Sequence, residues 1–229
     1  MIGDPVAIVI RRSIERPSKS LVNAFAGAQT SFVVDAMNGK GALDYRIKPI
    51  KPGCPFVGTA VTASGGPRDN LGAMAMLDFV EAGDVLVIAT GADESGAVIG
   101  DNYARVAKKL GVVAIVTDGL VRDAAGINDC GMPAYARGTS PNAGYPHGPG
   151  EVNQPVALGP VAIQPGDILV GDDDGIVVVP LAEADTIAAQ LEKVKSMEAK
   201  IEASITSGER RHLWNPTDYE DRGGVKYLD

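Results

Sequence analysis

The stretch DVLVIATGADESGAVIGDNYARVAKKLGVVAIVTDG, residues 84–119, decides the fold. It begins with an apolar run over 84–90 and ends with another over 111–119, and each run is typical of a buried strand. Between them, residues 101–111 carry basic side chains before a glycine, which is how helices commonly end. Strand, loop, helix and strand at this spacing predict a βαβ unit whose two strands are parallel neighbours in one sheet.

The segments on either side predict further elements of an α/β fold. An alternating, β-rich run at 55–64 predicts a strand, and the segment 71–83 predicts a helix that ends at Gly83. After Pro133, short runs separated by Pro and Gly indicate a β-rich layer. The remaining expected elements are two short helices within 20–38, a short helix at 123–130, strands within 133–138, 151–158, 161–171 and 175–180, and a helix from about 181 to 206.

Length and composition favour a globular enzyme or binding protein built as one domain over residues 1–229. The chain has 45% hydrophobic and 22% charged residues, and its net charge of −8 with a pI near 4.8 argues against a nucleic-acid partner. No apolar run approaches the length of a membrane span, and the N-terminal apolar run precedes its positive charges, the reverse of a secretory signal. We therefore expect a cytoplasmic protein without a membrane partner.

Charged residues follow both strands of the predicted βαβ unit. Ligands of open α/β sheets bind beyond the carboxyl ends of the parallel strands. The first strand leads within a few residues to Gly100-Asp101, and the second leads to Arg122-Asp123. Two carboxylates and a guanidinium could then face one crevice, where carboxylates suit Mg²⁺ or Mn²⁺ and Arg122 suits an anionic substrate.

Each of these residues also has a structural interpretation. Asp123 opens a predicted helix and could be only its N-cap, and Asp101 stands in the same position before the preceding helix. Arg122 could be a solvated surface charge. The residues alone therefore leave both interpretations open.

Other polar segments give weaker indications of a site. Residues 64–70, SGGPRDN, could form a backbone nest for an anion or a plain turn. The acids of 171–180 lack the EF-hand spacing, so a tight turn is favoured over a calcium site. His147 and His212 have no partner at ligand spacing, which favours surface histidines. The Pro- and Gly-rich segment 137–151 predicts a long loop, either functional or disordered.

The predicted C-terminal helix carries an acid within its apolar stripe. Apolar residues recur every three or four positions, and this spacing predicts another at 198, where the chain has Glu198. The stripe consists of Ala184, Ile187, Leu191, Val194, Ile201 and Ile205. An acid in such a stripe is costly unless it is paired, liganded or solvated.

Several motifs, taken in order, resemble those of the RraA-like proteins, a family that includes class II pyruvate aldolases acting on 4-hydroxy-4-methyl-2-oxoglutarate and 4-carboxy-4-hydroxy-2-oxoadipate. They are Asp69-Asn70, AGDVLVI at 82–88, Gly100-Asp101, VTDGLVRD at 116–123 and PGDILVGDDDGIVVVP at 165–180. The resemblance covers nearly the whole chain. It implies a layered α-β-β sandwich related to the swivelling phosphohistidine domain, assembled as a homotrimer or a dimer of trimers.

The resemblance also implies roles for particular residues. Asp123 is implied to hold Mg²⁺ or Mn²⁺, with Asp101 nearby, and Arg122 to contact the keto oxygen of a small 2-oxo acid. Asn70, Gly100 and Asp101 are implied to bind the substrate beside Arg122. Glu198 resembles an acid that the C-terminal helix contributes, at a subunit interface, to the site of a neighbouring subunit. The catalytic set is then Arg122, Asp123 and Asp101, and the metal ligands are Asp123 and Glu198.

One position departs from the family pattern. The aldolases follow Arg-Asp, after two residues, with an acid, whereas this chain has Gly126 there and Asp129 one turn later. The implied reaction is cleavage of a 4-hydroxy-2-oxo dicarboxylic acid to pyruvate through a metal-bound enolate, with oxaloacetate decarboxylation as a related activity. The alternative is a non-catalytic, protein-binding regulator of an RNA-degrading enzyme; such regulators tend to lose the acid that is Asp123 here. A methyltransferase is disfavoured, since no glycine-rich loop with a following ribose-binding acid stands after the first strand.

Overall fold

The structure is a computed structural model that describes residues 6–208 and 217–228. One compact unit extends to Leu191, and a second begins at Glu192. The expectation of a single domain over 1–229 stays a prediction. His212 lies outside the described residues.

Three parallel strands form the centre of the first unit. β4 (Asp84–Ala89) lies between β3 (Phe56–Ser64) and β6 (Ala114–Thr117), and both pairings are parallel. The connection from β4 to β6 runs through α4 (Asp101–Lys109). The βαβ unit predicted from residues 84–119 is therefore confirmed.

Further strands extend this centre into a nine-stranded mixed sheet. Its main path has the order β1-β10-β3-β4-β6-β8-β2, and the antiparallel hairpin β13–β14 joins it at β3. The outer strands are β1 (Ile8–Ile10), β10 (Gly150–Val152), β8 (Ala134–Ala136), β2 (Lys48–Pro49), β13 (Ile168–Asp172) and β14 (Gly175–Val179).

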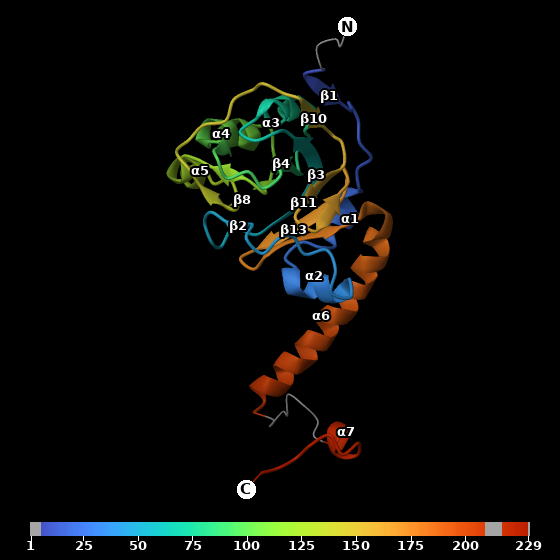
Figure 1. The fold of residues 1–229 in the computed structure, drawn as a ribbon. Helices are drawn as coiled ribbons and strands as arrows, with labels where there is room; N and C mark the ends of the chain where they lie inside the picture. The colour runs from blue at the N-terminus through green and yellow to red at the C-terminus, as the bar shows by residue number, and fades with distance from the viewer. Residues whose placement is uncertain (1–5, 209–216, 229) are drawn as a thin grey trace. The chain divides into compact units, whose positions relative to one another are not determined.

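The two faces of the sheet bury separate apolar clusters. On β4, Leu86 and Ile88 face one cluster while Val85 and Val87 face the other, as the two-residue period of a strand requires. The first cluster is covered by α3 (Leu71–Met76), α4 and α5 (Ala124–Asp129), of which α4 and α5 lie side by side (Figure 1).

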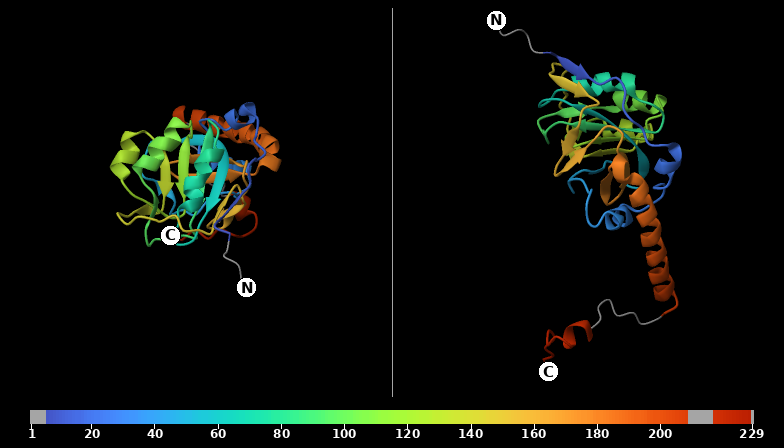
Figure 2. Two further views of the ribbon diagram at one scale, coloured as in Figure 1. Left: turned by 90° about the horizontal axis from the view of Figure 1, so that it is seen from above. Right: turned by 90° about the vertical axis from the view of Figure 1, so that its right-hand side faces the viewer.

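A second β layer covers the other face of the sheet. Leu158 of β11 (Val156–Leu158) and Ile163 of β12 (Val161–Ile163) belong to the cluster there, together with residues of β14. Figure 2 shows α4 and α5, in green, on one face of the central sheet. The fold is the predicted α/β sandwich with the layers α-β-β.

A small parallel sheet is present where the sequence indicated loops. β5 (Ala97–Ile99) pairs with β7 (Leu120–Val121), which pairs with β9 (Gly138–Thr139). These strands have two or three residues each, too few to show a period in the sequence. This sheet brings the segment after β4 beside the segment after β6, and it carries the candidate site.

Other boundaries differ in detail from the expectation. The helix predicted at 71–83 ends at Met76 and continues as the 3-10 turn η1 (Leu77–Phe79), and the strand predicted over 161–171 divides into β12 and β13. The expected short helices are α1 (Lys19–Asn23) and α2 (Thr30–Ala36).

The C-terminal helix begins close to its predicted start. The 3-10 turn η2 (Leu181–Glu183) leads into α6 (Ala184–Thr206), and the short helix α7 (Thr217–Glu220) follows the undescribed segment. Within the described part of the chain, no helix combines the length and apolar character that crossing a membrane would require.

Candidate functional site

Arg122 and Asp123 stand between β7 and α5. The backbone N–H of Arg122 donates to the carbonyl oxygen of Ile99 at 3.0 Å, which fixes the pair against β5. Asp123 has φ 56° and ψ 42°, a left-handed conformation that is uncommon for residues other than glycine. Its backbone carbonyl accepts from the N–H of Ile127 at 3.1 Å, but its side chain makes no capping hydrogen bond. Asp123 is thus the N-cap residue of α5, as the structural interpretation expected, but its carboxylate is not used for capping.

The two side chains form an exposed ion pair. Nε of Arg122 lies 3.4 Å from Oδ2 of Asp123, and the side chains are 44% and 50% exposed. A pair with that exposure contributes less than about 1 kcal/mol to stability. Both groups are consequently open to a ligand from solvent.

Gly100 allows the segment before α4 to approach this pair closely. A Cβ built on Gly100 would lie 2.7 Å from Oδ2 of Asp123 and 3.1 Å from Nε of Arg122. Any larger residue would displace one of the two charged groups. The Gly100-Asp101 and Arg122-Asp123 motifs, 22 positions apart in the chain, are therefore neighbours in space, as predicted from the strand ends.

A cavity of about 50 Å³ lies beside Arg122. It is lined by Asn70, Met74, residues 97–100, Arg122, Ala143 and Gly144. Asn70 is only 8% exposed, and its Oδ1 has no hydrogen-bond partner among the described residues. This volume exceeds the roughly 10–15 Å³ that one water needs, and it suits a small polar group such as a carboxylate. The structure thus brings Asn70, Gly100 and Arg122 together around one polar cavity.

Asp101 lies on α4 but is not among the residues that line this cavity. Its Oδ2 pairs with Nη2 of Arg105, one helical turn later, at 3.2 Å. The same carboxylate packs against Gly126, where a Cβ would lie 2.6 Å from Oδ2 and 2.7 Å from Cβ of Asp101. Asp101 therefore occupies the space that a side chain at position 126 would need. Its catalytic and substrate-binding roles stay predictions.

The loop 137–151 supplies one wall of the cavity through Ala143 and Gly144. The buried carboxylate of Asp69 accepts from the backbone N–H of His147 at 2.9 Å, and Asn70 N–H donates to the carbonyl of Tyr145 at 3.2 Å. These bonds tie the loop to the segment before α3. The interpretation of the loop as part of a site, left open by the sequence, is favoured by this placement.

The other polar segments serve the fold. The backbone N–H of Arg68, within the possible anion nest, donates to Oδ2 of Asp93 at 3.0 Å. In the acidic turn, Asp172 accepts from the backbone N–H of Thr30 at 2.8 Å and from that of Asp174 at 2.9 Å. Both carboxylates accept from backbone N–H groups, which favours turns over a backbone anion nest at 64–70 and over a calcium site at 171–180.

The residues of the site fit a divalent cation that has only one or two protein ligands. Across 6–208 and 217–228, no three His, Cys, Asp or Glu side chains are grouped to hold a metal. Mg²⁺ needs no such group, since it keeps several waters and is commonly held by one or two carboxylates and by substrate oxygens. Asp123 offers a half-exposed carboxylate with no capping bond. Glu198 is half-buried on α6, in the second unit, and its role as a ligand stays a prediction.

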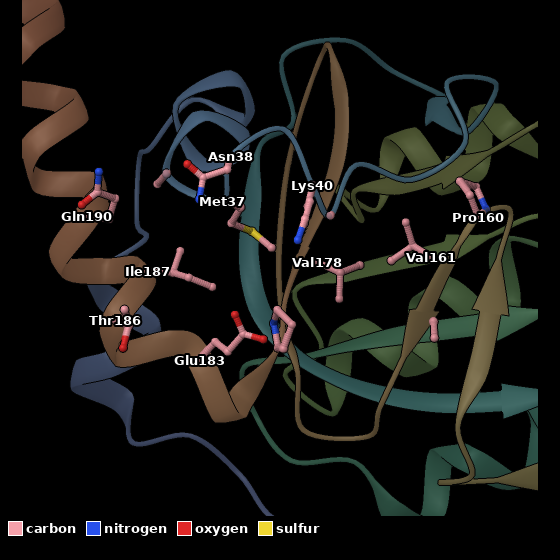
Figure 3. Close-up of a pocket in the computed structure, with 14 residues that line it drawn as sticks. Met37, Asn38, Lys40, Pro160, Val161, Val178, Glu183, Thr186, Ile187 and Gln190 are labelled. Carbon is pink, nitrogen blue, oxygen red and sulfur yellow. The ribbon is translucent and has the colours of Figure 1, made fainter.

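A larger pocket of about 550 Å³ lies elsewhere in the first unit (Figure 3). Met37, Val178 and Ile187 project into it, and Lys40 and Glu183 extend toward it from two different segments. The residues that line it include no Asp, His or Arg, and both charged groups are exposed. None of the predicted site residues belongs to it.

Sequence reasoning missed Met74, Ala143 and Gly144. Small or apolar residues of a helix and a loop give no chemical signal. Ala143 comes beside the site through its bridge to Ala97 of β5, and Met74 through its position on α3. The one available signal was the Pro- and Gly-rich composition of the loop 137–151.

Comparison with known proteins agrees with this fold. A family model described as Aldolase/RraA matches residues 30–178. A Halalkalibacterium halodurans protein named "Putative 4-hydroxy-4-methyl-2-oxoglutarate aldolase" is 34% identical over 182 residues, 80% of this chain and 85% of that protein.

Solved structures of the same kind are similar over most of their length. An uncharacterized protein from Pseudomonas syringae pv. tomato gives a TM-score of 0.76 at 27% identity, covering 86% of this chain and 96% of that one. RraAS2 of Streptomyces coelicolor, described as an unusual member of the RNase ES inhibitor RraA protein family, gives 0.73 at 29% identity, covering 82% and 99%. The chain belongs to the RraA-like family, Aldolase/RraA.

Proposed function

We propose that the protein is a divalent-metal-dependent lyase that cleaves a C–C bond of a 4-hydroxy-2-oxo dicarboxylic acid and releases pyruvate. The observation that carries the proposal is the Arg122-Asp123 pair, held in an exposed, left-handed turn beside a cavity that contains the unpaired Oδ1 of Asn70. The similarity to a protein named as an aldolase supports the substrate class.

The chain's own residues would perform three tasks. Arg122 binds the 2-oxo acid end of the substrate and shares the negative charge that develops on its keto oxygen. Asn70 offers a buried amide oxygen to a substrate hydroxyl. Asp123 would hold Mg²⁺ or Mn²⁺, directly or through water, and such an ion supplies Lewis-acid polarisation of the keto group.

The electron movement is that of a retro-aldol reaction. The C3–C4 bond breaks, its electron pair moves toward the keto oxygen, and the 4-hydroxyl becomes a carbonyl as it loses its proton. A proton then adds to C3 and gives pyruvate. Loss of CO₂ from oxaloacetate leaves the same enolate, so we propose oxaloacetate decarboxylation as a second activity of the site.

Assembly is part of the proposal. Beyond Leu191, the stripe residues Val194 and Ile201 of α6 are partly exposed and Ile205 is 61% exposed. We propose that this helix packs on a neighbouring subunit of a homotrimer or a dimer of trimers and brings Glu198 to the neighbour's site.

The activity is tested by pyruvate release from oxaloacetate in the wild type and in Arg122→Ala. We expect at least a 100-fold loss of kcat/KM, in the range found when a group that stabilises developing charge is removed. Arg46→Ala is the matched control, since Arg46 also pairs with a nearby aspartate, Asp44, at 2.6 Å but does not line the cavity. Full activity in Arg122→Ala would contradict the proposal.

A second candidate function is regulation of an RNA-degrading enzyme through protein binding. The similarity to RraAS2 and the net charge of −8 favour it. RNA cleavage by an RNase of the ES type, measured with and without the protein, tests this candidate. Inhibition that persists in Arg122→Ala, together with no pyruvate release by the wild type, would favour the regulator.

A further inference from the structure

Arg68 is a partly buried guanidinium without a counter-ion. Its Nη2 donates to the carbonyl oxygen of Ala143 at 3.0 Å, and its guanidinium carbon lies 5.2 Å from the ring centre of Tyr145. Its Nε is buried and has no hydrogen-bond partner in the described part of the chain, where no carboxylate side chain pairs with the guanidinium. An arginine has five N–H donors, so most of this group's capacity is unused.

The backbone holds this arginine in a fixed and unfavourable conformation. Arg68 has φ 57°, in the left-handed region that costs a side chain of this size about 1–3 kcal/mol. Its N–H donates to Oδ2 of Asp93 at 3.0 Å, and its carbonyl accepts from the N–H of Tyr145 at 2.7 Å. A strained residue with an unpaired, partly buried charge lowers the stability of the fold. Such residues occur mainly at sites where they bind a ligand.

Arg68 and Arg122 stand at opposite ends of β5. A Cβ on Gly96, just before the strand, would lie 3.1 Å from Nε of Arg68; a Cβ on Gly100, just after it, would lie 3.1 Å from Nε of Arg122. Three residues lie between these glycines, so four steps of extended chain separate them, about 13 Å. Between them, β5 and Ala143 line the cavity that also contains Asn70.

Because Nε of each arginine lies 3.1 Å from one of these Cβ positions, a separation of this order can accommodate a five-carbon dicarboxylic acid between the two guanidinium groups. Its two carboxylate carbons are about 5 Å apart when four C–C bonds are extended. A guanidinium carbon lies about 4 Å from the carbon of a carboxylate that it binds through two N–H···O bonds. With one arginine in line at each end of the acid, the two guanidinium carbons would be about 13 Å apart.

We infer that Arg68 binds the distal carboxylate of the substrate and thereby makes the site selective for dicarboxylic over monocarboxylic 4-hydroxy-2-oxo acids. The inference rests on the proposed function for the reacting end of the substrate, which Arg122 binds. The distal carboxylate supplies the counter-ion that Arg68 lacks. Arg68 is a specificity-determining residue in this account.

The test compares the wild type, Arg68→Gln and Arg68→Lys on two substrates, 4-hydroxy-4-methyl-2-oxoglutarate and the monocarboxylic 4-hydroxy-2-oxopentanoate. We expect the ratio of kcat/KM, dicarboxylic over monocarboxylic, to fall at least 10-fold in Arg68→Gln, through a raised KM for the dicarboxylic acid. Arg68→Lys, which keeps the charge, should recover part of the ratio. An equal loss on both substrates, or an unaltered ratio, would overturn the inference.

A binding measurement separates this inference from the proposed activity. The shift in Tm caused by 2-oxoglutarate, a dicarboxylate that needs no cleavage, should shrink in Arg68→Gln relative to the shift caused by pyruvate. If the wild type binds 2-oxoglutarate with this dependence yet releases no pyruvate, the inference stands and the proposed activity fails. If 2-oxoglutarate shifts Tm equally in both proteins, the inference fails whatever the activity.

Discussion

Nε of Arg122 lies 3.4 Å from Oδ2 of the adjacent Asp123, and Gly100 is the residue that lets the start of α4 approach both of them. The pair is exposed and local, so it contributes little to stability. The left-handed backbone at Asp123 adds a cost. The Arg122-Asp123 pair therefore does not stabilise the fold. Its geometry is best explained by the binding of a ligand.

Replacing Asp123 by glycine should separate stability from activity. Glycine adopts φ 56° without strain, so Asp123→Gly should raise the free energy of unfolding by up to about 1 kcal/mol while pyruvate release is lost. Asp129→Gly, at the exposed last position of α5, is the control and should lower it by about 0.3 kcal/mol, the difference between the helix propensities of Asp and Gly. Denaturant unfolding measures both, and a destabilised Asp123→Gly would show that the carboxylate has a structural role.

Gly126 and Asp101 should be energetically coupled. Gly126→Ala forces its Cβ against the Asp101 side chain and should lower the free energy of unfolding by about 1–3 kcal/mol. Asp101→Gly removes the atoms that the new Cβ would meet. The loss of unfolding free energy in the double variant should therefore be smaller, by about 1 kcal/mol, than the sum of the losses in the two single variants. A double-mutant cycle by denaturant unfolding checks this. Additive losses would mean that Asp101 does not fill the space at position 126.

Asp167 should give stability a specific pH dependence. Burial raises the pKa of this carboxyl above its ordinary value of 3.8, although the N–H groups of Leu181 and Gln164, at 2.9 Å and 2.8 Å, oppose the shift. The folded state then holds the proton more tightly than the unfolded state. The stabilisation from that proton is complete below pH 3.8 and is lost as the pH rises through the folded pKa.

The variant Asp167→Asn tests this sign. Its loss of stability relative to the wild type should be larger near pH 3.5 than at pH 7, because only the wild type loses proton-linked stabilisation as the pH rises. Thermal unfolding over this range measures the difference, with the exposed Asp185→Asn as the control. A loss that grows toward pH 7 would mean that the pKa of Asp167 is lowered by its hydrogen bonds.

Glu198 should act on the site of a neighbouring subunit. Glu198→Gln and Arg122→Ala should each be inactive, and a refolded equimolar mixture should recover about one quarter of wild-type activity, because one site in four then combines two intact residues. Mass spectrometry of the intact assembly confirms that the subunits have mixed. Mixed assemblies without recovered activity would place Glu198 outside the neighbour's site.

The sequence predicts those strands and helices that are long enough to show a periodic pattern of apolar residues. The apolar runs of β4 and β6 and the helix α4 are long enough to be recognised, and the parallel pairing of the two strands follows from the helical crossover between them. β5 and β7 have only three and two residues, so their pairing could not be predicted, although it places Gly100 beside Arg122.

The charged residues of the site could be predicted from the sequence, whereas their backbone conformation and neighbours could not. Strand ends indicated Arg122 and Asp123, but the left-handed backbone of Asp123 is a tertiary outcome that no propensity encodes. The sequence indicates a backbone anion nest or a plain turn at 64–70, and it gives no role to the side chain of Arg68, because the missing counter-ion becomes visible only when its neighbours are known.

Pyruvate release from 4-hydroxy-4-methyl-2-oxoglutarate by the purified protein, with Mg²⁺ and then with excess chelator, tests the central claim most directly. The account predicts turnover that exceeds the metal-only blank, disappears with chelator, returns with added Mg²⁺ or Mn²⁺, and is absent in Arg122→Ala. Turnover that persists in chelator, or no turnover with either metal, would contradict it.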